Sequence, residues 1–391
     1  MKILHVIGGF TWSYGGSARV VYDISRKLAE KGHEVTIFTT DLGLNSSNAD
    51  NHIHFHEHNV EVRYFQCLNH WLAHKMNLII SPQMHTELKK EVKNFDLVHL
   101  HNFRGIPNYY VWSQARKANV PYVLQADGST PLIIGEQGPL TTLSKMLYDT
   151  IIGRKIFNNA DKLIAISQEE QKQYLDLHAT NDKISLIYMG LDLNLFENLP
   201  DKGMFKNKYN LNRKIILYLG RIHSSKGIEY LIKAFHSLRE DSNDLTLVII
   251  GPDDGYKEEL LKLVSKLNLE NDVFFLDFID EKYKLCAYVD AEVFIHTVMY
   301  MGGVGITPLE SILCGTPVIV TDECGEIIKE ADCGYFVEYG NVYHLQNKIK
   351  HVLGNAEEAN KKVLKGQEYI KNNLGYDQIV EKLEKLYREL L

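Results

Sequence analysis

Residues 214–235 read KIILYLGRIHSSKGIEYLIKAF, and this stretch decides the class of the fold. It opens with a short apolar, β-branched run of the kind that forms a strand buried on both faces of a sheet. Gly220 ends that run, and from Gly227 onward the apolar residues recur at the three- and four-residue spacing of an amphipathic helix. A buried strand, a glycine turn and a helix form the repeating unit of parallel α/β sheets.

The same unit recurs along the whole chain. In the first half we predict helices at 17–31 and 83–94, and strands at 2–7, 34–39, 60–65, 96–100, 121–125, 162–166 and 184–187. In the second half we predict strands at 214–220, 245–251, 273–277, 293–296 and 317–321, and helices near 227–239, 256–267, 281–288 and 306–314. This alternation predicts an α/β protein with two Rossmann-like, doubly wound parallel sheets facing a central cleft. Open α/β sheets bind ligands beyond the carboxyl ends of their strands, so we expect functional residues there.

The length of the chain supports two domains, because 391 residues exceed the size at which one hydrophobic core keeps growing. The polar segment 194–213, which contains Pro200 and Gly203, is the predicted linker. We therefore expect domains at 1–196 and 205–374. A final helix over 375–391 carries apolar residues three or four positions apart, and this stripe must pack on another part of the protein.

The composition of the chain argues against several functional classes. A net charge of −7 without a dominant basic stripe argues against a nucleic-acid partner. The apolar run at 1–7 is too short for a signal sequence, and no stretch approaches the roughly 18 apolar residues of a membrane span. The five cysteines show no C-x-x-C spacing, which is typical of reduced thiols. We expect a cytoplasmic protein.

Two cations flank the turn of the quoted stretch. Arg221 follows the strand end directly, and Lys226 stands just before the helix. A planar guanidinium and a point-charge ammonium can converge on one diphosphate. Two solvated cations beside a turn remain an equally open interpretation.

A second glycine-rich turn opens a later helix, through Gly302, Gly303, Val304, Gly305 and Ile306. Its unpaired N–H groups and the positive helix end predict an anion site. Glu310, about one turn into the helix, can accept hydrogen bonds from sugar or ribose hydroxyls. Simple chain reversal by the glycines, and a charge favoured by the helix dipole at Glu310, are the alternatives.

The first half offers weaker candidates. Gly15 and Gly16 lie between the first strand and the first helix without forming a G-x-G-x-x-G fingerprint, so they permit close backbone approach to a phosphate or sugar, or form a plain turn. His99 and His101 lie at a strand end, and we expect them on opposite faces, with His101 near a sugar or acceptor or serving a structural role.

Two further patterns remain open. The row from His52 to His58 alternates imidazoles as a strand would, which permits a metal site, although an exposed loop or edge strand is the preferred interpretation. Segments 71–93 and 145–155 mix apolar residues with basic ones. They are either core helices with solvated outer faces or surfaces that contact an anionic membrane peripherally.

Taken together and in order, these motifs resemble glycosyltransferase family four, whose members are retaining enzymes of the GT-B fold. The resemblance rests on GR…KGIEYLIKAF at 220–235, ES…CGTPVI at 310–319, DLVHLHN at 96–102, PYVL at 121–124, ADKLIAIS at 160–167 and GLD…F at 190–196. It also includes Gly15 and Gly16 and the C-terminal helix, so it covers nearly the whole chain.

The resemblance implies a role for each half. The first domain would bind a glycan or lipid-linked acceptor, the second would bind a nucleotide-diphosphate-sugar such as a UDP- or GDP-sugar, and the last helix would cross back to the first domain. Arg221 and Lys226 would neutralise the diphosphate, and Glu310 would hold the ribose. Other donor contacts would come from Gly16, Phe278, Ile279, Gly303, Val304, Gly305 and Ile306. We expect no metal and no cofactor, because the two cations and the helix end supply the positive charge.

Two positions depart from the family pattern. A second glutamate is usual eight positions before Glu310, where this chain has Gly302, and a histidine is usual before Gly128, where it has Asp127. Asp127 could position a sugar hydroxyl or stabilise developing positive charge, or it could be a turn residue. A non-catalytic nucleotide-sugar-binding protein, or an epimerase or phosphorylase of the same fold, therefore stays open.

Overall fold

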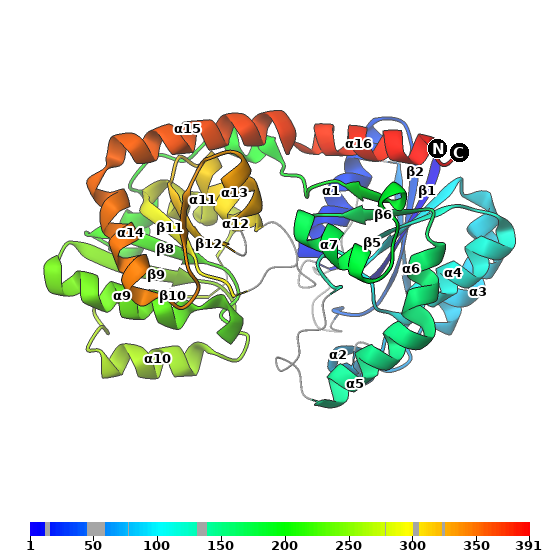
Figure 1. Ribbon diagram of the computed structural model, residues 1–391, viewed down its shortest axis with the longest axis horizontal. Helices are drawn as coiled ribbons and strands as arrows, with labels where there is room; N and C mark the ends of the chain where they lie inside the picture. Colours follow the sequence, from blue (N-terminus) through cyan, green and yellow to red (C-terminus); the bar gives the residue numbers. More distant parts are fainter. Residues whose placement is uncertain are drawn as a thin grey trace. The chain divides into compact units, whose positions relative to one another are not determined.

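A computed structural model describes residues 1–11, 16–44, 59–76, 78–130, 139–277, 279–299, 305–322 and 325–391. The chain forms two compact units. The first contains Met1–Gly190 together with Tyr376–Leu391, and the second contains Leu191–Gly375. Figure 1 shows that each unit is a sheet covered by helices.

The first unit is built on a seven-stranded sheet in which each recorded strand pair is parallel. Its order is β3-β2-β1-β4-β5-β6-β7. The strands are β1 (Lys2–Gly9), β2 (Glu34–Thr40), β3 (Val60–Phe65), β4 (Leu97–His101), β5 (Tyr122–Gln125), β6 (Lys162–Ala165) and β7 (Ile184–Leu186). The chain reverses direction across the sheet between β1 and β4, and this is where doubly wound sheets bind ligands.

Helices cover both faces of this sheet. They are α1 (Gly16–Glu30), α2 (His70–Met76), α3 (Pro82–Glu91), α4 (Ile106–Ala118), α5 (Pro139–Tyr148), α6 (Arg154–Asn159), α7 (Gln168–Asp176) and α16 (Tyr376–Arg388). One apolar cluster joins a sheet face to α1 and α16, and another joins the opposite face to α3, α4, α6 and α7.

The C-terminal helix α16 belongs to the first unit, as the sequence predicted. Its apolar stripe is buried beside α1 and the sheet. The aromatic ring of Tyr376 packs so closely on Gly190 that a Cβ there would lie 2.5 Å from it. Lys31 and His33 hold Glu384 at 2.6 and 2.7 Å, which adds polar contacts along the edge of the helix.

The second unit repeats the topology with six parallel strands in the order β10-β9-β8-β11-β12-β13. The strands are β8 (Lys214–Leu219), β9 (Leu245–Ile250), β10 (Val273–Leu276), β11 (Ala291–His296), β12 (Val318–Thr321) and β13 (Tyr335–Val337). The helices are α8 (Met204–Tyr209), α9 (Ile228–Asp241), α10 (Lys257–Lys266), α11 (Glu281–Asp290), α12 (Ile306–Leu313), α13 (Glu326–Glu330), α14 (Val342–Gly354) and α15 (Ala356–Asn373). The reversal point of this sheet lies between β8 and β11.

The structure corrects the predicted linker at 194–213. This segment contains the helix α8, and it belongs to the second unit, which begins at Leu191. Phe205 is fully buried, and the carboxylate of Asp290 in α11 accepts hydrogen bonds from the N–H groups of Gly203 and Lys206. Although the segment is polar in composition, Phe205 fixes it to the core of the second unit. Within the described residues, no helix is both long and apolar enough to span a membrane.

Candidate functional site

The turn between β8 and α9 is fixed by the backbone of the neighbouring strand. Gly227 has a left-handed backbone (φ +61°), and a Cβ there would lie 2.3 Å from the carbonyl oxygen of Thr297, which follows β11. The hydroxyl of Thr297 in turn donates to the carbonyls of Lys226 and Gly227 at 3.2 Å. Only glycine fits at this position, so the turn is held against the reversal point of the sheet.

Lys226 therefore stands beside the end of β11. Its positive charge acts on the imidazole of His296, the last residue of that strand. Burial, and after it the charge of Lys226, lower the pKa of His296 to about 3. His296 is thus neutral at physiological pH, so the positive charge beside the end of β11 comes from Lys226 and not from His296.

Arg221 extends from the same turn toward the loop that follows β9. Its guanidinium is paired with the carboxylate of Asp254 at 2.5 Å, and 64% of its side chain is exposed. The two loops are also joined through the backbone, because the N–H of Ile222 donates to Pro252 and that of Asp254 donates to Ile222. An exposed pair of this kind contributes little stability. Arg221 can therefore exchange Asp254 for a stronger anion at small cost.

Glu310 lies on α12 and is mostly buried, and its carboxylate faces α11. One carboxylate oxygen accepts a hydrogen bond from Lys284 at 2.7 Å, and the other accepts one from the Tyr288 hydroxyl at 2.9 Å. Burial lowers the pKa of Lys284, but the negative charges of Glu310 and Glu281 raise it by more. The pKa of Lys284 is therefore raised overall. A carboxylate held in this way keeps lone pairs for one more donor. Ahead of it, Gly305 and Ile306 lead into α12.

Two of the predicted residues of the first unit lie together at the ends of β4 and β5. The Nδ1 of His101 lies 3.4 Å from a carboxylate oxygen of Asp127, whose other oxygen accepts a hydrogen bond from Gln125 at 2.6 Å. Asp127 has a left-handed backbone (φ +53°), and only 2% of its side chain is exposed. The carboxylate therefore points into the unit. In this structure it contacts His101 and Gln125.

His101 and His99 share one face of β4, so the prediction that they lie on opposite faces is wrong. Their ring centroids are 4.2 Å apart. Residues two apart in a strand point to the same side, which is the physical reason. Gly16 begins α1, and a Cβ there would meet nothing within 4 Å, so open space adjoins its backbone.

Sequence reasoning missed a glutamate that fixes the loop after β5. Glu170, in the first turn of α7, accepts hydrogen bonds from the N–H of Gly128 at 2.8 Å and from that of Ile166 at 2.9 Å. Burial raises its pKa to about 8. Ser167 caps the same helix, and the spacing of Ser167 and Glu170 is that of a capping box, which was the available signal.

Some predicted residues cannot be placed. Gly15, Phe278, Gly303 and Val304 lie outside the described residues, as do Gly302 and the row His52–His58. Ile279 is described, and it follows β10 with a half-buried side chain.

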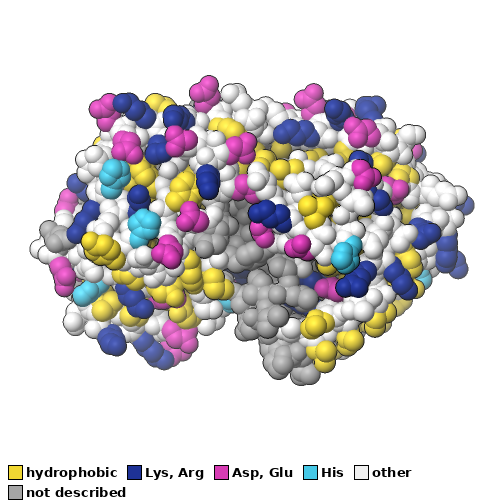
Figure 2. Space-filling model, in the orientation of Figure 1, with side chains coloured by type: hydrophobic (Ala, Val, Ile, Leu, Met, Phe, Trp, Pro, Cys, Tyr) yellow, Lys and Arg dark blue, Asp and Glu magenta, His cyan; other side chains and the backbone are white. Residues whose placement is uncertain are grey.

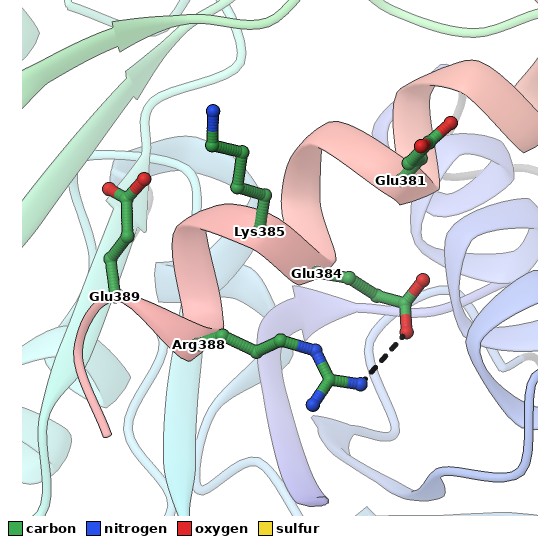
Figure 3. Close-up of a pocket in the computed structure, with 5 residues that line it drawn as sticks. All are labelled: Glu381, Glu384, Lys385, Arg388 and Glu389. Carbon is green, nitrogen blue, oxygen red and sulfur yellow. Dashed lines mark ion pairs between the residues drawn. The ribbon is translucent and has the colours of Figure 1, made fainter.

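Two surface depressions lie away from these residues. One, of about 420 Å³, is lined by five charged side chains of the C-terminal segment, with Arg388 3.8 Å from Glu384 (Figure 3). The other, of about 260 Å³, is lined by residues around the amino ends of β8 and β9. Neither contains a predicted site residue. The first is the solvent-facing side of the C-terminal helix.

Two family models match the chain in succession. The model for glycosyltransferase family 4 matches residues 14–195, and the model for glycosyl transferases group 1 matches residues 201–368. The chain belongs to glycosyltransferase family 4. It is thus a glycosyltransferase of the GT-B fold, with two Rossmann-like domains, as the sequence predicted.

Similar proteins cover most of the length of this glycosyltransferase. The N-acetyl-alpha-D-glucosaminyl L-malate synthase of Bacillus anthracis is 23% identical over 386 residues, or 97% of this chain and 95% of that protein. The N-acetylgalactosamine-N,N'-diacetylbacillosaminyl-diphospho-undecaprenol 4-alpha-N-acetylgalactosaminyltransferase of Campylobacter jejuni is 25% identical over 276 residues, or 70% and 71%.

A solved structure shows the same fold. Anabaena Alr3699/HepE, crystallised in complex with UDP, covers all of this chain and all of its own, with a TM-score of 0.80 at 18% identity.

Proposed function

We propose that this glycosyltransferase transfers a hexose from a UDP- or GDP-sugar to a hydroxyl of a glycan or lipid-linked acceptor, with retention of configuration and without a metal at the diphosphate. The observation that carries the proposal is the β8–α9 turn, which holds Arg221 and Lys226 at the reversal point of the second sheet. Solved HepE binds UDP, and a relative carries diphospho-undecaprenol in its name, which supports this choice of donor and acceptor.

The charges of the second unit suit a leaving diphosphate. Arg221 exchanges its exposed carboxylate partner for phosphate oxygens, which its planar fork matches in two hydrogen bonds. Lys226 adds a second positive charge, and the N–H groups at the start of α12 add partial charge. Glu310 accepts the ribose hydroxyls with the lone pairs left over from Lys284 and Tyr288. Preorganised charge of this kind is a large contribution to catalysis.

The transfer itself requires one bond to break and one to form on the same face of the sugar. The bond from the anomeric carbon to the diphosphate oxygen breaks, and its electron pair leaves with the diphosphate. The acceptor hydroxyl oxygen then bonds to the anomeric carbon, and its proton goes to a phosphate oxygen of the departing group. Asp127 supports this step by fixing the loop after β5, because its buried carboxylate contacts His101 and Gln125 and does not itself reach the sugar.

Calorimetry with a panel of nucleoside diphosphates tests the donor site. Arg221→Ala and Lys226→Ala should each weaken binding about 10- to 100-fold, since hydrogen bonds to charged groups contribute about 1.5–3 kcal/mol. Lys233→Ala removes an exposed lysine of α9 and is the matched control. Binding at wild-type strength in both site variants would refute the proposed site.

The stereochemistry and the role of metals need a separate assay. NMR of the product should show the anomeric configuration of the donor. Turnover should show no saturable activation by Mg²⁺ or Mn²⁺. An inverted product, or a clear requirement for added metal, would refute those parts of the proposal.

The surface of α5 supports contact with a membrane that carries the acceptor. Over α5 and the π-helical turn Asp149–Gly153, four large apolar side chains at helical spacing are each more than half exposed: Leu143, Met146, Leu147 and Ile151. Figure 2 shows hydrophobic side chains gathered over this region. Arg154 and Lys155 follow, and they favour anionic lipids.

Sedimentation with vesicles of phosphatidylglycerol tests this surface. The wild type should bind, and Leu147→Glu should reduce binding several-fold. The control Leu261→Glu changes an exposed leucine on α10 and should leave binding unchanged. Equal binding by both variants would exclude α5 as the contact.

A further inference from the structure

Three histidines lie together in the interior of the first unit. His5 on β1 is paired in register with His99 on β4, and His101 follows two residues later on the same face. All three side chains are buried. The Nδ1 of His5 lies 2.9 Å from the Nε2 of His101, and one ring nitrogen from each residue lies within 4.8 Å of the other two. We call these residues the histidine cluster.

The cluster contains polar atoms that the described protein does not satisfy. The Nε2 atoms of His5 and His99 and the Nδ1 of His101 make no hydrogen bond within the described residues. Neighbouring Asn102 and Asp127 add an amide nitrogen and a carboxylate oxygen in the same condition. Buried polar atoms without partners are costly, and such a concentration indicates a bound ion or water.

The outer contacts of the cluster favour an ion. The hydroxyl of Tyr387 on α16 lies 2.7 Å from the Nδ1 of His99, which leaves the Nε2 of that ring facing inward. A carboxylate oxygen of Asp127 lies 3.4 Å from the Nδ1 of His101 without a hydrogen bond between them, and the Nε2 of that ring is directed at His5. Histidines that bind metal ions almost always have such a partner, often a carboxylate, on the second nitrogen.

We propose that the histidine cluster binds one zinc ion, through one nitrogen each of His5, His99 and His101. Imidazole nitrogens suit this metal, and three histidines with one remaining position form a known zinc ligand set. Zinc–nitrogen bonds of about 2.0–2.1 Å place tetrahedral ligand nitrogens about 3.4 Å apart, so the pair of His5 and His101 nitrogens at 2.9 Å opens slightly on binding. The ion ties β1 to β4 and, through Tyr387, secures α16 on the sheet. It takes no part in the transfer reaction.

The test is metal analysis of the full-length, untagged protein produced with added zinc. We expect close to one equivalent of zinc per chain after extensive dialysis. When the protein is refolded with Co²⁺ instead, we expect the visible absorption of four-coordinate cobalt. Less than a tenth of an equivalent of zinc, together with no cobalt spectrum, would overturn the proposal and leave buried water as the occupant.

Substitutions inside and outside the histidine cluster test whether the zinc is bound there. His99→Asn should lose the zinc while keeping the row His52–His58, so retention of a full equivalent would also overturn the proposal. His85→Asn removes a histidine of α3 outside the cluster and should keep the metal. Tyr387→Phe should bind zinc about 10-fold more weakly, as loss of an outer hydrogen bond to a ligand usually does. Zinc affinity unchanged in Tyr387→Phe would contradict its role in orienting His99.

Discussion

Replacing Glu310 by glutamine separates its contribution to the stability of the second unit from the ribose binding that we propose for it. The substitution keeps the shape of the side chain but removes its charge. Lys284 then loses a mostly buried partner at 2.7 Å and keeps only Glu281 at 2.8 Å. Tyr288 keeps an acceptor of lower strength.

The expected loss of stability follows from these contacts. Breaking a buried ion pair on one side costs about 3–5 kcal/mol when the remaining charge has no partner. Here Glu281 still neutralises Lys284, so we expect the lower value for hydrogen bonds to charged groups, about 1.5–3 kcal/mol. The control Glu281→Gln removes the more exposed partner of the same lysine and should cost less than about 1 kcal/mol.

Urea unfolding can follow the two units separately. All three tryptophans, at positions 12, 71 and 112, belong to the first unit, so their fluorescence reports on that unit, whereas circular dichroism reports on both. Glu310→Gln should lower the transition of the second unit in circular dichroism and leave the fluorescence transition in place. Equal stability of Glu310→Gln and wild type would refute the stabilising role of the network.

Nucleotide binding then tests the second role. Glu310→Gln should weaken binding of a nucleoside diphosphate about 10-fold, while Glu281→Gln should leave it unchanged. A Glu310→Gln protein that is destabilised but binds with wild-type affinity would show that the carboxylate serves the fold and does not contact the ribose.

Three further predictions follow from single contacts. Asp254→Asn removes the exposed partner of Arg221, worth at most about 1 kcal/mol, so calorimetry should show nucleoside diphosphate binding up to about 5-fold tighter; weaker binding would contradict the exchange of partners. A left-handed alanine costs about 1–2 kcal/mol, and Gly227→Ala adds a steric clash to this cost. The control Gly255→Ala has φ +85° and open space for a Cβ, so thermal unfolding should show a larger loss of stability for Gly227→Ala. Equal losses of stability would argue against the clash. Burial raises the pKa of Glu170 from 4.5 to about 8, so its stabilising protonated form is complete below pH 4.5 and lost as the pH rises through 8. The urea midpoint of the first unit should fall between pH 6 and 8.5, and Glu170→Gln should flatten that fall; an unchanged pH dependence would contradict the raised pKa.

The sequence predicted most elements of the fold because its signals are local. The buried strands and amphipathic helices repeat their periods within single segments, and the observed bounds of β8 and α9 lie within two residues of those predicted. The three-residue strand β13 was not predicted, although β7, which is equally short, was. Helices α14 and α15, which fill 342–373, were not predicted, although α15 buries residues at helical spacing. The short helix α8 depends on a distant carboxylate, which no local pattern reveals.

The place of the candidate residues along the strands was predictable from the sequence, but their contacts were not. Arg221 and Lys226 follow a strand end, and the topology of a parallel sheet brings such ends to one edge. Their surroundings come from other strands, because Asp254 follows β9 and Thr297 follows β11. The partners of Glu310 lie on α11, more than 20 residues earlier in the chain. Such pairs depend on the packed structure, so a single sequence does not reveal them.

The two units share one strand order, yet they place different chemistry at the reversal point of the sheet. In the second unit, Arg221 is exposed and is paired with the exposed carboxylate of Asp254, which suits a site that exchanges ligands. In the first unit, His101 ends β4 and Asp127 follows β5, on the neighbouring strands. Both side chains are buried and contact one another, which suits a site whose geometry must not change. A diphosphate needs mobile positive charge to bind and leave, whereas a buried polar cluster is costly unless fully satisfied. The difference in burial therefore supports the proposed ligand exchange in the second unit and a fixed supporting role for the polar side chains of the first.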